Sequence, residues 1–241
     1  MFLKKIKNLI REHISDQRQI LAQTNEVEWA MIYHDSIRGK AFLENLPLNI
    51  GRWAGNYSFF YVLNRVLSDF RPLKILDMGL GESSKFISTY LENQLHQSSH
   101  TVIEQNSEWI TLFKEKFTLT ERSTVIYLPL VQKNINSFQV NSYDGLEEQI
   151  TGIFDLYIVD GPFGSDRFSR FDIIGLLKRL NPQDEFMIIM DDMGRRGEQD
   201  TFNEIGKLFK TKGIAYTVGF YEGNKSVAII ASDKYKYATS L

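Results

Sequence analysis

The feature that most constrains this chain is an alternation of strand-like and helix-like segments that begins near residue 73. Seven apolar runs are typical of strands: residues 73–78, 100–105, 123–131, 154–161, 185–192, 214–222 and 226–232. Segments with helical periodicity lie between many of them: residues 83–95, 107–117, 171–180 and 198–213. This order predicts a doubly wound α/β domain, in which a mainly parallel sheet is covered by helices on both faces.

The two ends of the chain depart from this alternation. The last two strands are separated only by "GNK" (223–225), which is a hairpin signal, so we expect one antiparallel edge strand in the seven-stranded sheet. Residues 1–70 show helical periodicity and almost no strand pattern, and Pro72 separates them from the first strand. The sequence therefore predicts an N-terminal helical extension or cap (1–70) followed by one α/β domain (71–241).

Composition excludes several classes of function. The formal net charge of −2, without a basic block in the later chain, argues against a nucleic-acid-binding protein. The absence of cysteine excludes disulfides, thiolate zinc sites and cysteine nucleophiles. No apolar run approaches the roughly 20 residues of a membrane span, and the start lacks a secretory signal, so we expect a cytoplasmic protein.

The first residues, "MFLKKIKNLIREHI", form an amphipathic helical pattern. Basic residues lie between apolar residues at helical spacing, namely Phe2, Leu3, Ile6, Leu9 and Ile10. Such a helix can rest on an anionic membrane surface. Packing on its own domain or on a dimer partner is the favoured interpretation.

The end of the first predicted strand, "LDMGLGESS" (76–84), has the character of a nucleoside site. Gly79 and Gly81 permit a tight turn with close backbone approach, and the next strand ends in Glu104, which suits the two hydroxyls of a ribose. The third glycine of the dinucleotide fingerprint is replaced by Ser84, which argues against a pyrophosphate and against a nicotinamide oxidoreductase. Asp77 adds negative charge that suits a cationic ligand.

This stretch resembles motif I of S-adenosylmethionine-dependent methyltransferases of the Rossmann-like class, with Glu104 as its acidic partner. The resemblance covers roughly residues 50–232. It implies that Asp77, Gly79 and Gly81 line the methionine moiety and that Glu104 holds the ribose.

A second stretch, "GRWAGNYS" (51–58), resembles a segment that closes over the cofactor in related enzymes. That likeness makes Gly55, Asn56 and Tyr57 further candidates for cofactor binding. Many members of the class also have an acid after the third strand that binds the adenine amino group. Here "LPLVQKN" (128–134) has none, and Gln132 is the alternative.

Three carboxylates follow the fourth and fifth predicted strands. Asp160 ends one strand, and the adjacent pair Asp191 and Asp192 ends the other. Neighbouring strands lie about 5 Å apart, so the three side chains can converge on one ion, and carboxylates suit Mg²⁺. Each aspartate alone would be assigned as a cap or loop residue, but the three together favour a metal site.

The same residues carry a finer resemblance. The acids resemble those of metal-dependent O-methyltransferases of the catechol and macrocin types. "VDGPFGSDRFSR" (159–170) and "DDMGRRGEQDTF" (191–202) are closer to sugar-directed enzymes such as glucuronoxylan 4-O-methyltransferases. This resemblance implies that Asp160, Asp191 and Asp192 hold a divalent cation, which makes a bound hydroxyl more acidic. A general base is less clear, with Asp166, Asp192 and His34 as candidates.

Other residues near these motifs have open assignments. The arginines are either solvated surface charges or contacts for an acidic sugar: Arg167, Arg170, Arg195 and Arg196. Three aromatic residues can stack on a sugar or ring substrate or belong to the core: Trp53, Tyr57 and Phe163.

The sequence thus predicts an S-adenosylmethionine-dependent, cation-assisted O-methyltransferase that acts on a saccharide hydroxyl, with a surface-polysaccharide precursor as one candidate acceptor. The saccharide rests on the resemblance alone. Two alternatives are a catechol-like small-molecule O-methyltransferase and a non-catalytic cofactor-binding protein. A homodimer is compatible with the N-terminal helix.

Overall fold

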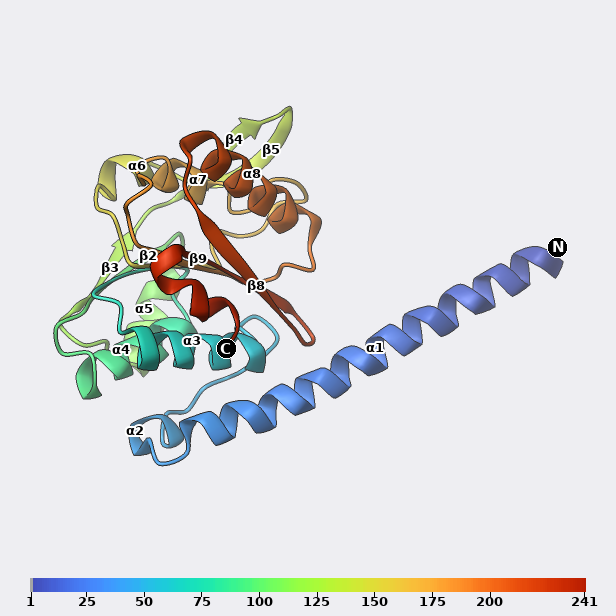
Figure 1. The fold of residues 1–241 in the computed structure, drawn as a ribbon, viewed down its shortest axis with the longest axis horizontal. Helices are drawn as coiled ribbons and strands as arrows, with labels where there is room; N and C mark the ends of the chain where they lie inside the picture. The colour runs from blue at the N-terminus through green and yellow to red at the C-terminus, as the bar shows by residue number, and fades with distance from the viewer. Residues whose placement is uncertain (1) are drawn as a thin grey trace.

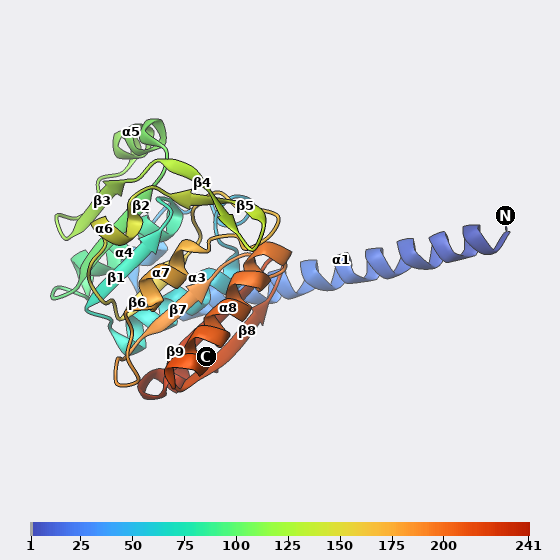
Figure 2. The same ribbon diagram turned by 90° about the horizontal axis from the view of Figure 1, so that it is seen from above.

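A seven-stranded sheet forms the centre of the molecule (Figures 1 and 2). The computed structural model describes residues 2–241, with side chains from residue 6 onward, so the side chains of Phe2 and Leu3 lie outside the described residues. In spatial order the strands are β3 (Ser123–Tyr127), β2 (Ser99–Glu104), β1 (Lys74–Met78), β6 (Leu156–Val159), β7 (Met187–Met190), β9 (Ser226–Ser232) and β8 (Tyr216–Glu222).

The strand directions confirm the predicted doubly wound architecture. The five strands from β3 to β7 in that order are parallel to one another. At the other edge, β8 and β9 form the predicted antiparallel hairpin. The strand that runs antiparallel to the rest of the sheet is β9, and it lies between β7 and β8 instead of at the edge of the sheet.

Side chains alternate between the two faces of the sheet, and both faces are buried. In β1, Ile75 belongs to one hydrophobic core and Leu76 to the other. All four residues of β6 and all four of β7 are buried, as expected for central strands of a parallel sheet.

Helices cover each face of this sheet. One core includes residues of α1 (Phe2–Ile37), α3 (Tyr57–Arg65), η1 (Val66–Phe70), α4 (Glu82–Asn93) and η2 (Asp233–Thr239). The other includes residues of α6 (Leu146–Gln149), α7 (Asp172–Leu177) and α8 (Arg196–Lys212). The short helix α2 (Ala41–Glu44) follows α1, and α5 (Ser107–Lys116) follows β2. The last part of the helical segment 1–70 therefore belongs to the covering layer of the sheet.

The expectation of one continuous strand over residues 123–131 is wrong. The strand β3 ends at Tyr127, and a separate antiparallel hairpin of β4 (Leu130–Ile135) and β5 (Phe138–Tyr143) follows. Pro129, between the two strands, has no N–H to contribute to a ladder. The two turn residues, Asn136 and Ser137, have φ angles of 50° and 70°, which suit a two-residue hairpin turn.

The long helix α1 contacts the domain only in its C-terminal half. Tyr33 and Ile37 are buried there in the core, whereas the N-terminal half extends away from the domain in both views (Figures 1 and 2). In residues 2–241, no helix combines the length and apolar character needed to cross a membrane.

Candidate functional site

The turn after β1 brings backbone atoms to the carboxyl edge of the sheet. Gly79 has a φ of 118°, a conformation that side chains disfavour, and its N–H donates to the Ile103 carbonyl at 2.9 Å. A Cβ on Gly81 would meet no atom within 4 Å among the described residues. The turn therefore leaves open space just before α4 begins.

Asp77 lies beneath this turn rather than on its surface. The side chain is buried and accepts hydrogen bonds from Ser84 Oγ at 2.6 Å and from Ser83 Oγ at 3.0 Å. The imidazole Nε2 of His100 lies 3.6 Å from the same carboxylate. Asp77 thereby anchors the start of α4, and its contact with a methionine moiety stays a prediction. Ser84, which stands in place of the third glycine, supplies the shortest of these bonds.

Glu104 links the turns that follow β1 and β2. Its two carboxylate oxygens accept from the Leu80 N–H at 3.0 Å and the Asn106 N–H at 2.8 Å, and the side chain is 3% exposed. Burial raises the pKa of Glu104, while these backbone donors oppose the rise. An ionised carboxylate accepts about four hydrogen bonds, so each oxygen retains capacity for a ribose hydroxyl.

Two further polar groups at this edge were missed by the sequence analysis. Tyr143 Oη and Gln105 Oε1 are buried, and neither has a hydrogen-bond partner among the described residues. The Tyr143 hydroxyl sits against the turn after β6, where a Cβ on Gly161 would approach it to 2.3 Å. Burial raises the pKa of Tyr143 well above its usual value, which keeps the hydroxyl neutral and able to donate. Gln105 ends the predicted strand 100–105, whereas Tyr143 ends a hairpin strand that the sequence analysis did not predict.

The segment around residue 56 is held by contacts within the protein. Asn56 caps α3, accepting from the Phe59 N–H at 3.2 Å, and its amide donates to Glu26 at 2.8 Å. A Cβ on Gly55 would lie 2.3 Å from the ring of Phe59, so only glycine fits there. A role of Gly55 and Asn56 in closing over a cofactor stays a prediction.

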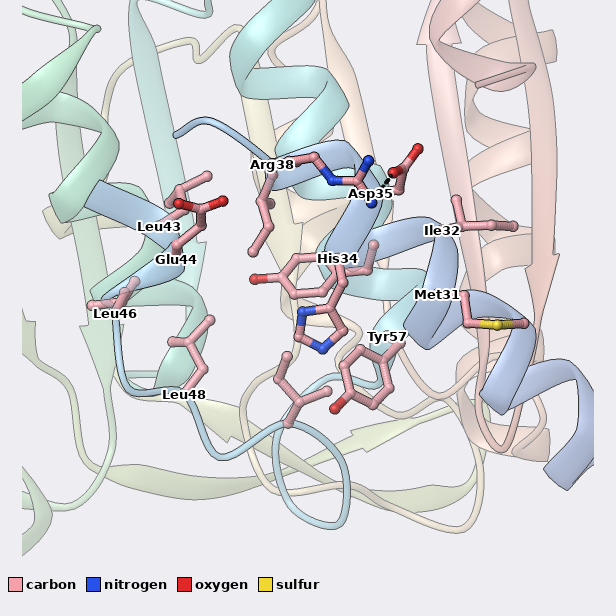
Figure 3. Close-up of a pocket in the computed structure, with 13 residues that line it drawn as sticks. Met31, Ile32, His34, Asp35, Arg38, Leu43, Glu44, Leu46, Leu48 and Tyr57 are labelled. Atoms are coloured by element: carbon pink, nitrogen blue, oxygen red, sulfur yellow. Dashed lines mark ion pairs between the residues drawn. The ribbon is translucent and has the colours of Figure 1, made fainter. Parts of the chain in front are cut away.

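Tyr57 and His34 lie together in a groove beside α1 (Figure 3). Their ring centroids are 5.7 Å apart, and the groove has a volume of about 830 Å³. Its remaining walls come from α1 and from the segment between residues 43 and 50. The structure therefore places His34, one of the candidate bases, in the wall of this groove and not at the acid cluster.

The structure brings together the three aspartates that follow β6 and β7. One carboxylate oxygen from each of Asp160, Asp191 and Asp192 lies within 4.8 Å of the others. Asp191 is fully buried and Asp192 is 7% exposed, whereas the Asp160 side chain is 24% exposed. The cluster thus opens to solvent on the side of Asp160.

Two cationic side chains from distant parts of the chain lie among these carboxylates. Arg170 Nη2 lies 3.0 Å from Asp160 and 2.9 Å from Asp192, and Lys225 Nζ lies 3.5 Å from both Asp191 and Asp192. Both interpretations offered for Arg170, a solvated surface charge or a sugar contact, are wrong. The residue is 3% exposed, and its guanidinium also donates to the Val159 and Asp191 carbonyls, so it is a structural counter-ion.

The charge of the cluster is only partly compensated by these cations. Glu198 lies 3.7 Å from Arg170, so four carboxylates face two buried or half-buried cations, while Arg195 contacts Asp192 from a largely exposed position. Burial raises the pKa of Asp160 to about 7, with Arg170 opposing the rise, and burial likewise raises the pKa of Asp191 against Lys225. Within the described part of the chain, Asp191 Oδ1 has no hydrogen-bond partner. Excess negative charge and an unpaired buried oxygen fit a divalent cation.

The remaining candidates lie around the site in different roles. Arg167 forms a half-buried ion pair with Asp200, and Gln132 is on the β4–β5 hairpin, where its amide donates to Asn141. Trp53 is 92% exposed and Phe163 is 55% exposed. The Ala54 carbonyl, next to Trp53, accepts from Lys225 at 2.9 Å, which links this segment to the acid cluster.

Comparisons with known proteins give a fold but no sequence family. No family model matches the chain, and no curated protein matches it in sequence. The O-methyltransferase TomG from Streptomyces achromogenes, which is involved in tomaymycin synthesis and was solved in complex with S-adenosylmethionine, is similar in structure. The match has a TM-score of 0.53 at 13% identity and covers 89% of this chain and 98% of TomG.

A second match is the O-methyltransferase from Bacillus cereus in complex with S-adenosylhomocysteine, with a TM-score of 0.47 and 13% identity. It covers 88% of this chain and 91% of the Bacillus protein. Because TomG and this chain are only 13% identical in sequence, their structural similarity establishes the fold alone. This chain has the Rossmann-like fold found in S-adenosylmethionine-dependent methyltransferases.

Proposed function

We propose that this protein is an S-adenosylmethionine-dependent O-methyltransferase that acts on a saccharide hydroxyl with the help of a divalent cation. One observation carries the proposal. The glycine turn with Glu104 and the cluster of Asp160, Asp191 and Asp192 lie at the carboxyl edge of the same sheet. Ligands of open α/β sheets bind at this edge, so donor and acceptor sites would be neighbours.

The residues of the first strand turn suit the cofactor. Glu104 would accept the ribose hydroxyls, Gly81 leaves room for the ligand backbone, and the Tyr143 hydroxyl and Gln105 carbonyl offer further polar contacts. When bound, S-adenosylmethionine supplies an electrophilic methyl group on a sulfonium. The protein's contribution is to hold the acceptor oxygen in line with that methyl at near-attack distance.

The acid cluster suits a divalent cation, with Asp160, Asp191 and Asp192 as its protein ligands. A bound divalent cation would supply Lewis acidity, which lowers the pKa of a hydroxyl that it contacts. Arg170 holds Asp160 and Asp192 from the buried side, which keeps the carboxylates in place with or without the ion. Lys225 places its ammonium group beside Asp191 and Asp192, where it can orient an acceptor oxygen.

The class of acceptor is the most specific part of the proposal. Trp53 and Phe163 present exposed aromatic surface on segments that contact or follow the acid cluster, and such surface suits the faces of a sugar ring. A planar catechol-like acceptor would use the same aromatics. The resemblance to glucuronoxylan-type enzymes favours the saccharide, and a surface-polysaccharide precursor stays our leading acceptor.

Calorimetric titration with S-adenosylmethionine, in the presence and absence of Mg²⁺, tests the proposal. We expect cofactor binding by the wild type and a Mg²⁺ signal that disappears in Asp191→Asn with Asp192→Asn. Asp233→Asn is the matched control, because Asp233 is a largely exposed aspartate that pairs with Lys236, and its substitution should leave both signals unchanged. Methyl transfer from labelled cofactor to a panel of acidic sugars, neutral sugars and catechols then identifies the acceptor.

Each part of the proposal fails separately. The methyltransferase assignment is wrong if the wild type does not bind S-adenosylmethionine. If the cofactor binds but Mg²⁺ neither binds nor changes turnover, the cation is excluded and Lys225 becomes the residue to substitute. Transfer to catechols alone would replace the saccharide with the small-molecule alternative, and binding without transfer would favour the non-catalytic alternative.

A further inference from the structure

The described part of α1 carries a stripe of exposed apolar residues from Ile6 to Met31. Its members recur at helical spacing and are each between 39% and 67% exposed: Ile6, Leu9, Ile10, Ile14, Ile20, Leu21, Val27 and Met31. Exposed apolar residues scattered singly need no explanation, but a continuous stripe of this kind marks an interaction surface.

Most of the stripe lies on the side of α1 that faces away from its own domain. Tyr33 and Ile37 are buried on the face that packs on the domain, and Ile32 packs against the same core. Stepping back along the helix by whole turns from Tyr33 leads to Ala22, Ser15 and Asn8, which are small or polar. The half of α1 that extends from the domain (Figures 1 and 2) therefore has no large apolar residue in this row, and its exposed apolar residues occupy other rows of the helix.

Charge differs between the two halves of α1. Residues 2–18 contain five lysines and arginines and two acids. Residues 19–37 contain three acids and neither lysine nor arginine. A helix that lay along an anionic membrane would need basic residues throughout, so this distribution disfavours a membrane surface. Two helices that run in opposite directions would instead place each basic half beside an acidic half.

We propose that α1 pairs with α1 of a second copy of this chain in antiparallel orientation, burying the apolar stripe. A register in which paired residue numbers add to about 41 sets apolar residues opposite apolar residues: Ile10 opposite Met31, Ile14 opposite Val27, and Ile20 opposite Leu21. The same register brings Lys7 within one turn of Asp35 and Arg11 within one turn of Glu28. A parallel pair would place like-charged halves side by side.

The groove beside the C-terminal half of α1 extends this surface. It begins at Met31, where the stripe ends, and continues over Leu46, Leu48 and Ile50 (Figure 3). In the antiparallel register the N-terminal half of the partner helix lies over residues 31–35. The apolar residues near its start, Ile6 and Leu9, would then fill the groove of about 830 Å³.

The absence of native cysteine allows a direct test by cross-linking of the full-length protein. We expect Leu21→Cys, close to the twofold axis, to give covalent dimers with a short bismaleimide. Ile10→Cys and Met31→Cys should each cross-link poorly alone but efficiently when mixed. Ser15→Cys, on the opposite face, is the matched control and should stay uncross-linked. Efficient self-linking of Ile10→Cys would mean a parallel pair and would overturn the proposal.

Sedimentation of the wild type and of Ile14→Glu gives a second, independent measure. Because the Ile14 side chain is largely exposed on the half of α1 that leaves the domain, this substitution should leave the fold intact, which circular dichroism can verify. Burying a carboxylate without a partner should weaken dimerisation about 100-fold or more. A wild type that sediments as a monomer at high concentration, or that binds anionic vesicles as a monomer, overturns the proposal. None of these outcomes depends on the proposed methyl transfer.

Discussion

Two groups of buried carboxylates lie at the same edge of the sheet, and the protein stabilises them by different means. Asp77 and Glu104 receive hydrogen bonds from hydroxyls and backbone N–H groups. The cluster around Asp191 is instead paired with the cations of Arg170 and Lys225. Hydrogen bonds from neutral donors are enough to stabilise a single buried carboxylate, whereas several adjacent carboxylates repel one another and require cationic partners.

The donors of the two groups also differ in their origin along the chain. The serines that bind Asp77 lie six and seven residues from it. Arg170 lies 22 residues from Asp192, and Lys225 lies 34 residues from Asp191. Asp77 is therefore held by a local structure, whereas Glu104, which accepts from Leu80 24 residues away, and the acid cluster both need distant segments to meet.

The largest effect should follow from removing a counter-ion. Arg170→Met leaves Asp160, Asp192 and Glu198 without their shared buried cation, so we expect the free energy of unfolding to fall by about 3–5 kcal/mol. Arg65→Met, which breaks a half-exposed pair with Asp69, should cost less than about 1 kcal/mol. Urea denaturation measures both. Equal losses in the two variants would mean that the cluster does not depend on a buried cation.

A smaller effect is expected at Glu104, beside the glycine turn that follows β1. Glu104→Gln replaces one acceptor oxygen with an amide that cannot accept from a backbone N–H or a ribose hydroxyl. The loss should be about 1.5–3 kcal/mol, or roughly 10-fold to 100-fold in affinity for S-adenosylmethionine by calorimetry. Glu108→Gln, on the exposed first turn of α5, should bind as the wild type does. Unchanged affinity of Glu104→Gln would remove Glu104 from the cofactor site.

The smallest effect should be a pH dependence of cofactor binding. Because burial raises the pKa of Glu104, protonation of its carboxylate begins at higher pH than for a free glutamate, and the protonated form accepts fewer hydrogen bonds. Affinity should therefore fall on acidification, beginning at a higher pH than for an ordinary glutamate, and by no more than the loss in Glu104→Gln. That variant, titrated over the same pH range, should show a flatter profile. A wild-type affinity that rises on acidification would contradict this role of Glu104.

Much of the site could be predicted because strand ends obey simple geometry. Parallel strands terminate at one edge of a sheet, so residues that directly follow them are expected to meet. This reasoning correctly predicted that Asp160 would lie near Asp191 and Asp192, whereas binding of a ribose by Glu104 stays a prediction. Apolar runs and hairpin signals were likewise enough to predict the seven strands and the antiparallel pair.

The sequence could not predict which side chains turn inward from loops. Phe168 and Arg170 adopt positive φ angles of 48° and 59°, and no periodic pattern encodes the bend that carries the Arg170 side chain into the core. In the sequence, Lys225 contributed only to the hairpin signal "GNK", and nothing indicated that it would pair with Asp191 and Asp192. The β4–β5 hairpin was missed because its apolar start continued the preceding strand, and with it the position of Tyr143.

The insertion of β9 between β7 and β8 has a consequence for the order of biosynthesis. A chain emerging from the ribosome can assemble β1, β2 and the turn that carries Glu104 long before residue 225 has been made. At that stage Asp191 and Asp192 already exist but lack Lys225, and β7 has no neighbour on one side. The nascent chain would thus form the glycine turn with Glu104 early and neutralise its acids late, which makes the closing hairpin the step that completes both the sheet and the charge balance.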